Sequence, residues 1–423
     1  MENTQKRGLS HSWIKKTVML AMALLLGLIS FFLFNSIKAN ADMSKLSTSG
    51  KNIVNANGDT VHLKGVNAGG LFETEHFMNN TPYSTWRDML DTTNGNGSDQ
   101  ANTWEGNYWS DADFQNIQDL GFNTIRLPFN YMNLINYSKY KNNLNTSNLS
   151  DIMDDDSNAF SKMDSFISKA NDHNLYVVLD MHGAFGSQNG NDHSGDTSQG
   201  ANLINNENNK SLTTQLWNRI AAHYSSWSNV AGYDLLNEPE NANSNYDGNG
   251  QSAWGSVWDF YNDLYQDIRK NDSNHMIIME SCWDPVDLPD PSQYGWSNIV
   301  YEYHEYPSVN SDSQDQGYWN QMVSDLKTAN YNVPTYIGEF SLARNNYTSG
   351  TGEWKYALDD FNNNGYSWTV WNYRAKASAA NWGLYSEDDQ DNVDATSSDF
   401  GKPVNQKLDT NISSALEDAA KAQ

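Results

Sequence analysis

Two apolar stretches of the chain each end on a glutamate. Residues 232–239, GYDLLNEP, place Asn237 and Glu238 after an apolar run, and residues 334–340, PTYIGEF, do the same with Glu339. Such runs are typical of buried strands that deliver polar side chains to the rim of a barrel or sheet. Two carboxyl groups at two strand ends are what glycosidic bond cleavage requires. We therefore expect Glu238 and Glu339 to act on a glycosidic bond.

The chemistry of this pair sets requirements on its neighbours. Cleavage with retention needs two carboxyl groups about 5–5.5 Å apart, one protonated and one ionised. Burial and repulsion between the two groups would raise the pKa of the proton donor. A hydrogen bond donated by Arg126 would keep the other carboxylate charged. Asn237 is expected to contact the sugar 2-hydroxyl group, where a hydrogen bond strengthens in the transition state.

Strand and helix patterns alternate along most of the chain. Ser110 and Asp113 predict a capped helix start, and Gly121 ends that helix. Further helices are predicted at about 159–173, 212–224, 252–270 and 405–420. Strands are predicted at 63–67, 122–129, 175–179, 230–236, 276–279, 299–303, 334–337 and 366–370. This alternation indicates an α/β fold, a (β/α)8 TIM barrel forming a single catalytic domain over residues 42–423.

In a (β/α)8 barrel the active site lies at the C-terminal ends of the strands. For Glu280, a charge on a solvated loop is as good an interpretation as a place in the active site. For His182 a structural role is the usual one, but its neighbours at adjacent strand ends favour a sugar contact. The residues at or near the ends of the predicted strands are Asn67, Arg126, His182, Asn237-Glu238, Glu280, His304, Glu339 and Trp371.

Other polar and aromatic residues are given no role in the chemistry. Asp192 and His193 lie in a polar loop without the spacing of metal ligands, so we interpret them as loop residues. Tyr303, Trp283 and Trp382 fit a groove wall and core packing equally well.

The start of the chain has the pattern of an exported protein. Lys15 and Lys16 precede an apolar run at 17–34, and Ala39-Asn40-Ala41 predicts a signal peptide over residues 1–41 with cleavage after Ala41. The run is also about long enough to span a bilayer, so an uncleaved anchor is an alternative. We expect a secreted or cell-surface protein.

Two further segments precede the predicted helix at Ser110. Residues 53–63 alternate apolar and polar side chains around Asn57-Gly58, which predicts a short β-hairpin at the barrel bottom. Residues 68–103 are predicted to form a long loop, and loops of that length are usually functional or disordered.

The composition favours a neutral ligand. There are 26 Lys and Arg residues against 52 Asp and Glu, a formal net charge of −26. Such a surface repels nucleic acid and anionic lipid. Aromatic residues make up 13% of the chain, and we expect most in the core and a few against sugar rings. The single cysteine, Cys282, excludes an intramolecular disulfide. We expect a monomer without cofactor or metal ion.

The ordered set of strand-end motifs resembles glycoside hydrolase family 5, the large cellulase and glucanase family of (β/α)8 barrels. The resemblance runs from about residue 65 to 371. GVNAGG at 65–70 followed by Glu75, with DMHGAFGSQNG at 180–190, is similar to the exo-β-1,3-glucanase branch. That branch usually has tryptophan where Leu71 stands and proline where Phe185 stands. The motifs are Arg126, His182, Asn237-Glu238-Pro239, His304-Glu305-Tyr306, Glu339 and Trp371.

The resemblance implies Glu238 as acid/base and Glu339 as nucleophile of a retaining β-glycosidase, with Trp371 as the floor of the −1 subsite. A neutral β-glucan or gluco-oligosaccharide, with β-1,3 linkages favoured, would be the substrate. Alternatives are a β-1,4-glucanase or mannanase of the same family, transglycosylation, and an inactive glucan-binding surface protein. The residues expected to bind substrate are Glu75, Arg126, His182, Asn237, His304, Tyr306 and Trp371.

Overall fold

The computed structural model describes residues 43–92, 97–240, 251–281, 284–344, 351–390 and 393–422. The predicted signal peptide, Cys282 and Trp283 lie outside the described residues. Within the described ranges, no helix combines the length and the hydropathy needed to cross a membrane.

Eight parallel strands close into a barrel in the order β10-β3-β4-β5-β6-β7-β8-β9. This confirms the predicted (β/α)8 TIM barrel. Several strands, β5 and β9 among them, extend further at their C-terminal ends than predicted, because these ends carry polar residues that weaken the apolar pattern. The strands are β3 (Lys64–Asn67), β4 (Thr124–Asn130), β5 (Tyr176–Gly183), β6 (Val230–Asp234), β7 (Met276–Glu280), β8 (Ile299–Glu305), β9 (Thr335–Phe340) and β10 (Ser367–Val370).

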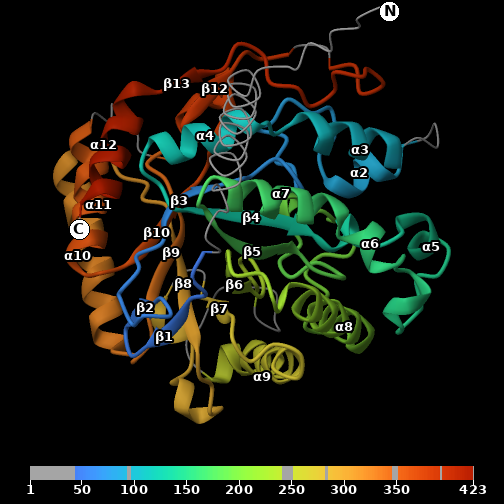
Figure 1. Cartoon of the computed structure of the whole chain (residues 1–423), viewed down its shortest axis with the longest axis horizontal. Coiled ribbons are helices and arrows are strands. Elements are labelled where there is room, and N and C mark those ends of the chain that lie inside the picture. Colours follow the sequence, from blue (N-terminus) through green and yellow to red (C-terminus); the bar gives the residue numbers. More distant parts are fainter. Residues whose placement is uncertain are drawn as a thin grey trace, which may run out of the picture. The chain divides into compact units, whose positions relative to one another are not determined.

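Helices surround the strands (Figure 1). The predicted capping box of α4 is present, with the Ser110 backbone N–H donating to Asp113 at 2.7 Å. The helix α8 begins at Glu207, earlier than predicted, because Asn206 caps a polar first turn that carries no apolar signal. The outer helices are α4 (Asp111–Asp119), α7 (Ser161–Asp172), α8 (Glu207–Tyr224), α9 (Gln251–Ile268), α10 (Asp312–Ala329), α11 (Thr351–Asn363) and α12 (Thr410–Lys421).

The predicted N-terminal hairpin exists, but its paired strands lie earlier in the chain. It consists of β1 (Ser47–Ser49) and β2 (Asn52–Val54), which turn at Gly50. The turn at Asn57-Gly58 also forms, followed by an isolated antiparallel bridge between Val54 and Thr60. Apolar side chains of the hairpin pack against the first residues of the barrel strands. The hairpin therefore closes the N-terminal end of the barrel, as predicted.

The long segments after β3 and β4 contain helices of their own. The helices α2 (Trp86–Leu90) and α3 (Gly97–Asn107) lie in the segment after β3, where a loop was predicted. After β4 follow the 3-10 turn η1 (Tyr131–Asn133), α5 (Tyr137–Lys141) and α6 (Asp156–Ala159). These elements are short and polar, so they carry little hydrophobic periodicity. They add a layer on the C-terminal side of the barrel.

A small sheet follows the last barrel strand and was not predicted. It joins β11 (Arg374–Lys376), β12 (Tyr385–Glu387) and β13 (Lys407–Leu408). Such short strands give no clear alternation of polar and apolar residues. Arg374 is fully buried and pairs with Asp113 at the start of α4 at 2.8 Å. The pair fastens the small sheet to the outer helix layer.

Candidate active site

The C-terminal strand ends surround a cavity of about 140 Å³. Most of the predicted site residues line it, whereas Arg126 and His304 are fully buried and act on the lining residues through hydrogen bonds. The lining residues are Glu75, Phe77, His182, His193, Asn237, Glu238, Tyr306, Glu339, Arg344, Trp371 and Trp382.

Both carboxylate oxygens of Glu339 accept a strong hydrogen bond. Arg126 Nη1 donates to Oε1 at 2.7 Å, and the Tyr306 hydroxyl donates to Oε2 at 2.6 Å. Charge-assisted hydrogen bonds of this length fix the carboxylate and stabilise its negative charge. The predicted bond from Arg126 is therefore present, and Tyr306 adds a second one.

Arg126 lies among more acidic groups than the sequence pattern predicts. Besides Glu339 it pairs with Asp234 at 2.9 Å, Glu302 at 3.1 Å and Asp180 at 3.2 Å, all fully buried. A buried charge is tolerated only when it is paired. Acidic residues inside otherwise apolar strands were the signal that could have revealed these partners.

One arginine cannot neutralise all of these carboxyl groups. Burial raises the pKa of Asp180 well above its ordinary value, although Arg126 opposes the shift. Burial likewise raises the pKa of Asp234 to about 6 and that of Glu302 to about 7. The floor of the site therefore holds protons on some of its acids at neutral pH.

Glu238 is held at both its backbone and its side chain. Its φ angle is +44°, and its backbone N–H donates to Glu280 Oε2 at 2.6 Å. Its Oε1 lies 3.0 Å from His304 Nδ1, and its Oε2 lies 3.4 Å from His193 Nε2. Asn189 Nδ2 donates to its carbonyl oxygen at 3.2 Å. Loop and strand residues thus fix the direction of the Glu238 carboxyl group together.

Two partners of Glu238, namely Glu280 and His193, have other roles than the sequence pattern indicated. Glu280 is buried at the end of β7, so its interpretation as a solvated loop charge is wrong. His193 lines the cavity, so it is more than a loop residue. Only its position in the segment after β5 could have suggested this.

The pKa of Glu238 departs from the expectation for a proton donor. Burial raises this pKa, but the hydrogen bond from His304 and the charges of His193 and His304 outweigh it and lower the pKa to about 2. Burial lowers the pKa of His304, whereas the charges of Glu280 and Glu339 and the hydrogen bond to Glu238 raise it well above its ordinary value. The proton shared by Glu238 and His304 therefore resides on the imidazole.

His304 also sets an upper limit on the separation of the two glutamates. Its Nδ1 atom lies 3.0 Å from Glu238 Oε1 and 3.5 Å from Glu339 Oε2. These two oxygen atoms are therefore at most about 6.5 Å apart. They border the same cavity, which is the arrangement that two-carboxylate chemistry needs.

Aromatic rings form one side of the cavity. Trp371 lies parallel to the His182 ring, with centroids 5.4 Å apart and an interplanar angle of 6°. His182 Nδ1 lies 2.7 Å from Asp180 Oδ2, which fixes the ring. Trp382 meets Phe77 edge to face at 5.4 Å, so the groove-wall interpretation of Trp382 is confirmed. Tyr303 is buried in the core and does not line the cavity.

The geometry agrees with a comparison of the chain with known families. The family model for cellulase, glycosyl hydrolase family 5, matches residues 54–377. The chain belongs to glycosyl hydrolase family 5. It is a glycoside hydrolase.

Relatives of this family 5 enzyme act on several β-linked sugars according to their names. It is 26% identical to a beta-xylosidase of Phanerodontia chrysosporium, covering 78% of this chain and 71% of that one. It is 27% identical to a glucan 1,3-beta-glucosidase of Candida oleophila, covering 70% and 68%. The match to glucan 1,3-beta-glucosidase I/II of Saccharomyces cerevisiae, also 27% identical, covers 60% of this chain and 57% of the yeast protein.

Solved structures share the fold of the enzyme. An endogalactoceramidase aligns with a TM-score of 0.61 and 19% identity, covering 89% of this chain and 85% of that one. A beta-glucanase from Saccharophagus degradans in complex with cellotetraose aligns with a TM-score of 0.55 and 17% identity, covering 90% and 94%. At these identities the likeness concerns the barrel architecture.

Among the described residues, Glu238, Glu280 and His304 form the one group whose ligand atoms lie close enough together for a metal ion, all within 4.8 Å. In this family 5 enzyme His304 Nδ1 lies 3.0 Å from Glu238 Oε1 and 3.3 Å from Glu280 Oε1. Glu280 accepts from the Glu238 backbone, and the His304 imidazole is protonated. A metal ion would have to displace that proton. That the site works without a metal ion stays a prediction.

Proposed function

We propose that this family 5 enzyme is a retaining β-glycosidase in which Glu238 is the acid/base and Glu339 the nucleophile. The observation that carries the proposal is the position of both carboxyl groups beside one atom, His304 Nδ1, at 3.0 and 3.5 Å. Inverting enzymes keep their carboxyl groups about 6.5–9.5 Å apart to admit a water molecule. An upper limit of about 6.5 Å between Glu238 Oε1 and Glu339 Oε2 therefore favours retention.

The reaction proceeds by double displacement. A Glu339 oxygen attacks the anomeric carbon, the glycosidic C–O bond breaks, and the proton of Glu238 passes to the leaving oxygen. In the second step Glu238 takes a proton from water, whose oxygen attacks the anomeric carbon and breaks the ester bond to Glu339. Arg126 and Tyr306 hold the carboxylate in place for attack and stabilise it when it is released.

The proton for the first step comes through His304. In the folded protein the imidazole holds it, 3.0 Å from Glu238 Oε1. Transfer across this hydrogen bond makes Glu238 the acid, and the leaving oxygen then takes the proton. Glu238 and His304 thus titrate together as one proton-donating pair.

The remaining lining residues bind the sugar. Asn237 Oδ1 accepts from Arg126 at 3.0 Å, which leaves its amide Nδ2 to donate to the 2-hydroxyl group. Glu75 and His182 are positioned to bind other hydroxyl groups, and Trp371 supplies an apolar face for the ring. Ligand pockets for drug-sized molecules measure about 300–1,000 Å³. The cavity of about 140 Å³ therefore favours one sugar ring at the point of cleavage.

A neutral β-glucan is the proposed substrate, with β-1,3 linkages favoured. Two relatives named above are glucan 1,3-beta-glucosidases, and the net charge of −26 disfavours an acidic polysaccharide. Leu71 and Phe185, where the chain departs from the exo-β-1,3-glucanase pattern, are buried and do not line the catalytic cavity. These departures therefore leave the cavity wall unchanged.

The catalytic assignment is tested by replacing Glu339. Glu339→Gln should abolish turnover while circular dichroism and the melting temperature report an intact fold. Azide added to Glu339→Gly should restore cleavage of an aryl β-glucoside and give the α-glycosyl azide, because azide then attacks where the carboxylate stood. Normal activity of Glu339→Gln would sink the assignment.

The linkage is tested with a substrate panel. Laminarin, lichenan, carboxymethylcellulose, mannan, aryl β-glucoside and aryl β-xyloside should be compared at equal enzyme concentration. Highest kcat/KM on laminarin and laminari-oligosaccharides is expected. A preference for carboxymethylcellulose or mannan would replace the β-1,3 assignment. Product analysis at high substrate concentration separates hydrolysis from transglycosylation.

We also propose that the enzyme is exported, on the basis of the signal pattern in residues 1–41. Expression of the full chain in a secreting host should release protein whose first residue is Asp42. An intact N-terminus in the membrane fraction would instead support the uncleaved anchor.

A further inference from the structure

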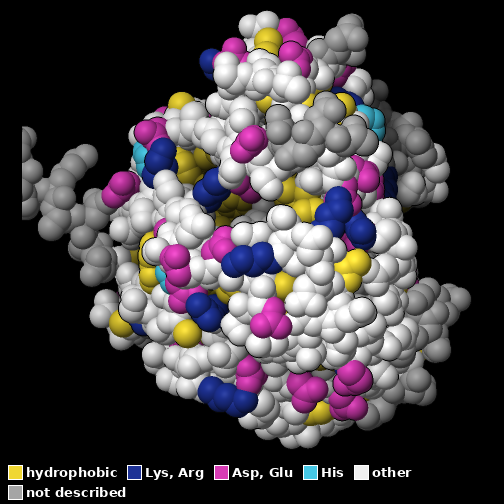
Figure 2. Space-filling view, turned by 90° about the vertical axis from the view of Figure 1, so that its right-hand side faces the viewer, with side chains coloured by type: hydrophobic (Ala, Val, Ile, Leu, Met, Phe, Trp, Pro, Cys, Tyr) yellow, Lys and Arg dark blue, Asp and Glu magenta, His cyan; other side chains and the backbone are white. Residues whose placement is uncertain are grey.

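A second cavity lies apart from the catalytic one, between α3 and the segment that follows β4. Its volume is about 320 Å³, and it shares no lining residue with the catalytic cavity of about 140 Å³. The side of the molecule that carries these elements has a hollow with hydrophobic side chains in its depth and charged side chains of both signs at its border (Figure 2). The larger of these two cavities therefore lies outside the candidate active site.

One wall of this cavity is a network that joins α3, α7 and the turn η1. Asn133 Nδ2 donates to Glu105 Oε1 at 2.9 Å, and Lys162 Nζ donates to Asn102 Oδ1 at 2.6 Å. Lys162 also pairs with Glu105, whose side chain is only 7% exposed. The cation and the anion of this wall therefore neutralise each other.

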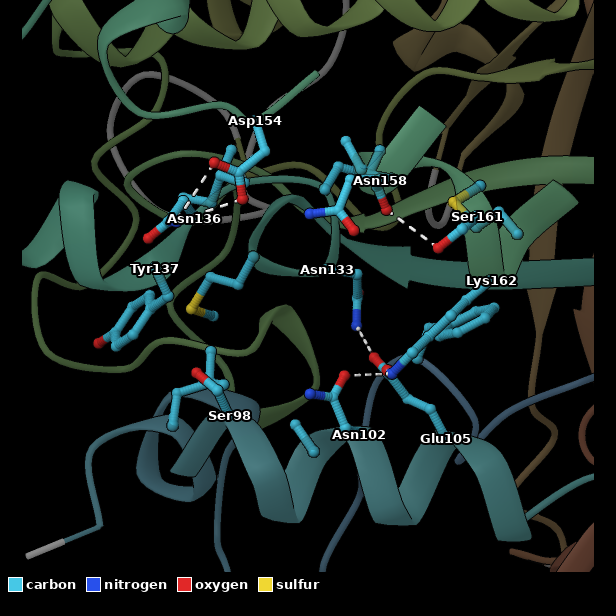
Figure 3. A pocket seen from close by; sticks show the side chains of 18 of the residues that line it. Ser98, Asn102, Glu105, Asn133, Asn136, Tyr137, Asp154, Asn158, Ser161 and Lys162 are labelled. Carbon is cyan, nitrogen blue, oxygen red and sulfur yellow. Dashed lines mark hydrogen bonds and ion pairs between the residues drawn. The ribbon is translucent and has the colours of Figure 1, made fainter. Parts of the chain in front are cut away.

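The opposite wall is a second network, from α5 and the chain around α6. Asn136 Nδ2 donates to Asp154 Oδ2 at 3.2 Å, and Lys139 Nζ donates to Asp154 Oδ1 at 2.9 Å. Figure 3 shows Asp154 and Asn136 on one side of the space and Lys162, Glu105 and Asn102 on the other. This wall, too, carries its charge already paired.

The chemistry of the lining selects a neutral, hydroxyl-rich ligand. Each amide offers both donors and an acceptor, and each hydroxyl offers one donor and acceptor lone pairs. Ser98, Asn158 and Ser161 add such groups at the rim. Because the lysine and the carboxylates are paired with one another, an anion or a cation would have to break an existing ion pair. A ligand with many hydroxyl groups can use these groups without doing so.

The apolar part of the lining suits the faces of sugar rings. Trp86 of α2 and Tyr137 of α5 are buried and line the cavity, as do the thioethers of Met132 and Met163. Aromatic side chains with a polar rim are a common setting for ligands that have apolar faces and polar edges. The volume of about 320 Å³ lies at the lower end of the range for small-molecule pockets.

We propose that this cavity, bounded by α2, α3, η1, α5, α6 and the start of α7, is a second, non-catalytic binding site for a neutral saccharide segment. Its walls follow the C-terminal ends of β3 and β4, the same end of the barrel that carries the catalytic cavity. A long glucan can therefore contact it while another part of the polymer is cleaved. The inference rests on membership of a sugar-cleaving family and is independent of the roles assigned to Glu238 and Glu339.

Tryptophan indole signals allow the two cavities to be observed separately. Trp86 lines the second cavity, and Trp371 and Trp382 line the catalytic one. The full chain carrying Glu339→Gln is labelled with ¹⁵N-indole tryptophan, and the signals are assigned with Trp86→Phe, Trp371→Phe and Trp382→Phe. Laminaritriose, cellotriose and mannotriose are then titrated in turn.

We expect at least one of these trisaccharides to shift the Trp86 signal with its own dissociation constant. Asn158→Trp should fill the cavity from α6 and abolish that shift, while Trp371 and Trp382 still respond. The matched control is Asn320→Trp, another exposed helical asparagine, which lies on α10 away from both cavities. It should leave all three signals responding. If Asn158→Trp does not fold, Ser98→Trp fills the cavity from α3.

Kinetics provide a second readout. Asn158→Trp should leave kcat/KM for an aryl β-glucoside within about twofold. At low polymer concentration the same variant should lower the activity on laminarin about fivefold or more, because it loses a second contact that raises the local substrate concentration. A Trp86 signal that no trisaccharide shifts, or a shift that persists in both cavity-filling variants, overturns the proposal. Failure of the catalytic assignment would appear separately, as full activity of Glu339→Gln.

Discussion

Glu238 adopts a backbone conformation that residues other than glycine avoid. Its φ of +44° lies in the left-handed region, which costs an ordinary residue about 1–2 kcal/mol. The hydrogen bond from its N–H to the buried Glu280 side chain, at 2.6 Å, offsets part of this cost. Burial raises the pKa of Glu280 well above its ordinary value, although the charge of His304 opposes the shift. Glu280 is therefore a positioning residue for Glu238.

Substitutions at Glu280 distinguish the positioning of the Glu238 backbone from an electrostatic effect of the Glu280 carboxyl group. Glu280→Gln keeps an acceptor for the Glu238 N–H and should retain kcat within about threefold. Glu280→Leu leaves that N–H buried without a partner, which costs about 1–3 kcal/mol, and should lower kcat by about tenfold or more. Steady-state kinetics on an aryl β-glucoside check both values. Equal losses in the two variants would contradict the positioning role.

Tyr306 positions Glu339 through a hydrogen bond from its hydroxyl group. Tyr306→Phe removes the hydrogen bond to Glu339 Oε2, and bonds to charged groups contribute about 1.5–3 kcal/mol. We expect kcat to fall about 10- to 100-fold while the melting temperature changes little. Tyr294→Phe is the matched control, because the Tyr294 hydroxyl donates to an exposed carboxylate, Asp259, outside the site. A similar loss in both variants would argue against a specific role.

At the scale of elements, the barrel depends on attachments between segments far apart in the chain. Asp113 in the first turn of α4 accepts from Arg374 Nη2 at 2.8 Å and from the Tyr373 hydroxyl at 2.8 Å. Both members of this ion pair are buried. The small sheet that follows β10 is thereby tied to α4, and Trp382 lies between β11 and β12 of that sheet. The outer wall of the catalytic cavity thus depends on this attachment.

Removing the arginine tests the attachment. Arg374→Met leaves the Asp113 carboxylate buried without its cation, and breaking a buried pair costs about 3–5 kcal/mol of unfolding free energy. Lys355→Met removes an exposed partner of Asp359 and should cost less than about 1 kcal/mol. Urea unfolding measures both. A cost of Arg374→Met no larger than that of the control would show that the pair does not stabilise the fold.

At the scale of the molecule, buried acids couple stability to pH. Burial raises the pKa of Glu302 and Glu305 to about 7 and that of Glu73 to about 8, and Asp234 reaches about 6. The folded protein keeps these protons where the unfolded chain has released them. The resulting stability is fully present below the ordinary carboxyl pKa and is lost as pH rises through the raised values. A tenfold difference in proton affinity between the folded and unfolded states corresponds to about 1.4 kcal/mol.

We therefore expect the free energy of unfolding to fall by several kcal/mol between about pH 4.5 and pH 8. Below about pH 4.5 it should fall again, because Glu238, whose pKa is about 2 when folded, loses its stabilisation as it takes up a proton. Urea unfolding at constant ionic strength measures the curve. Glu302→Gln removes one of the titrating groups and should flatten the decline above pH 5; an unchanged slope would contradict the assignment.

Much of the architecture was accessible from the sequence. Alternating apolar runs and helical faces identify eight strands, and the rule that parallel strands end on one side places Arg126, Glu238 and Glu339 together. The elements α2, α3, α5 and α6 were missed, because α2, α5 and α6 have only four or five residues and α3 is mostly polar, so none shows clear hydrophobic periodicity. The second cavity was missed for the same reason, since many of its lining residues come from those elements, beside residues of η1 and α7.

The sequence by itself therefore determined the barrel, the family and the two glutamates at strand ends, because these follow from periodicity and from the order of motifs along the chain. Only the tertiary structure decided how far the pKa of each buried acid and of His304 is shifted. Asp180, Asp234 and Glu302 reach Arg126 from three different strands, and His304 lies between both glutamates. Electrostatic interactions depend on distance and burial, and the distances between residues on different strands are set only when the barrel closes.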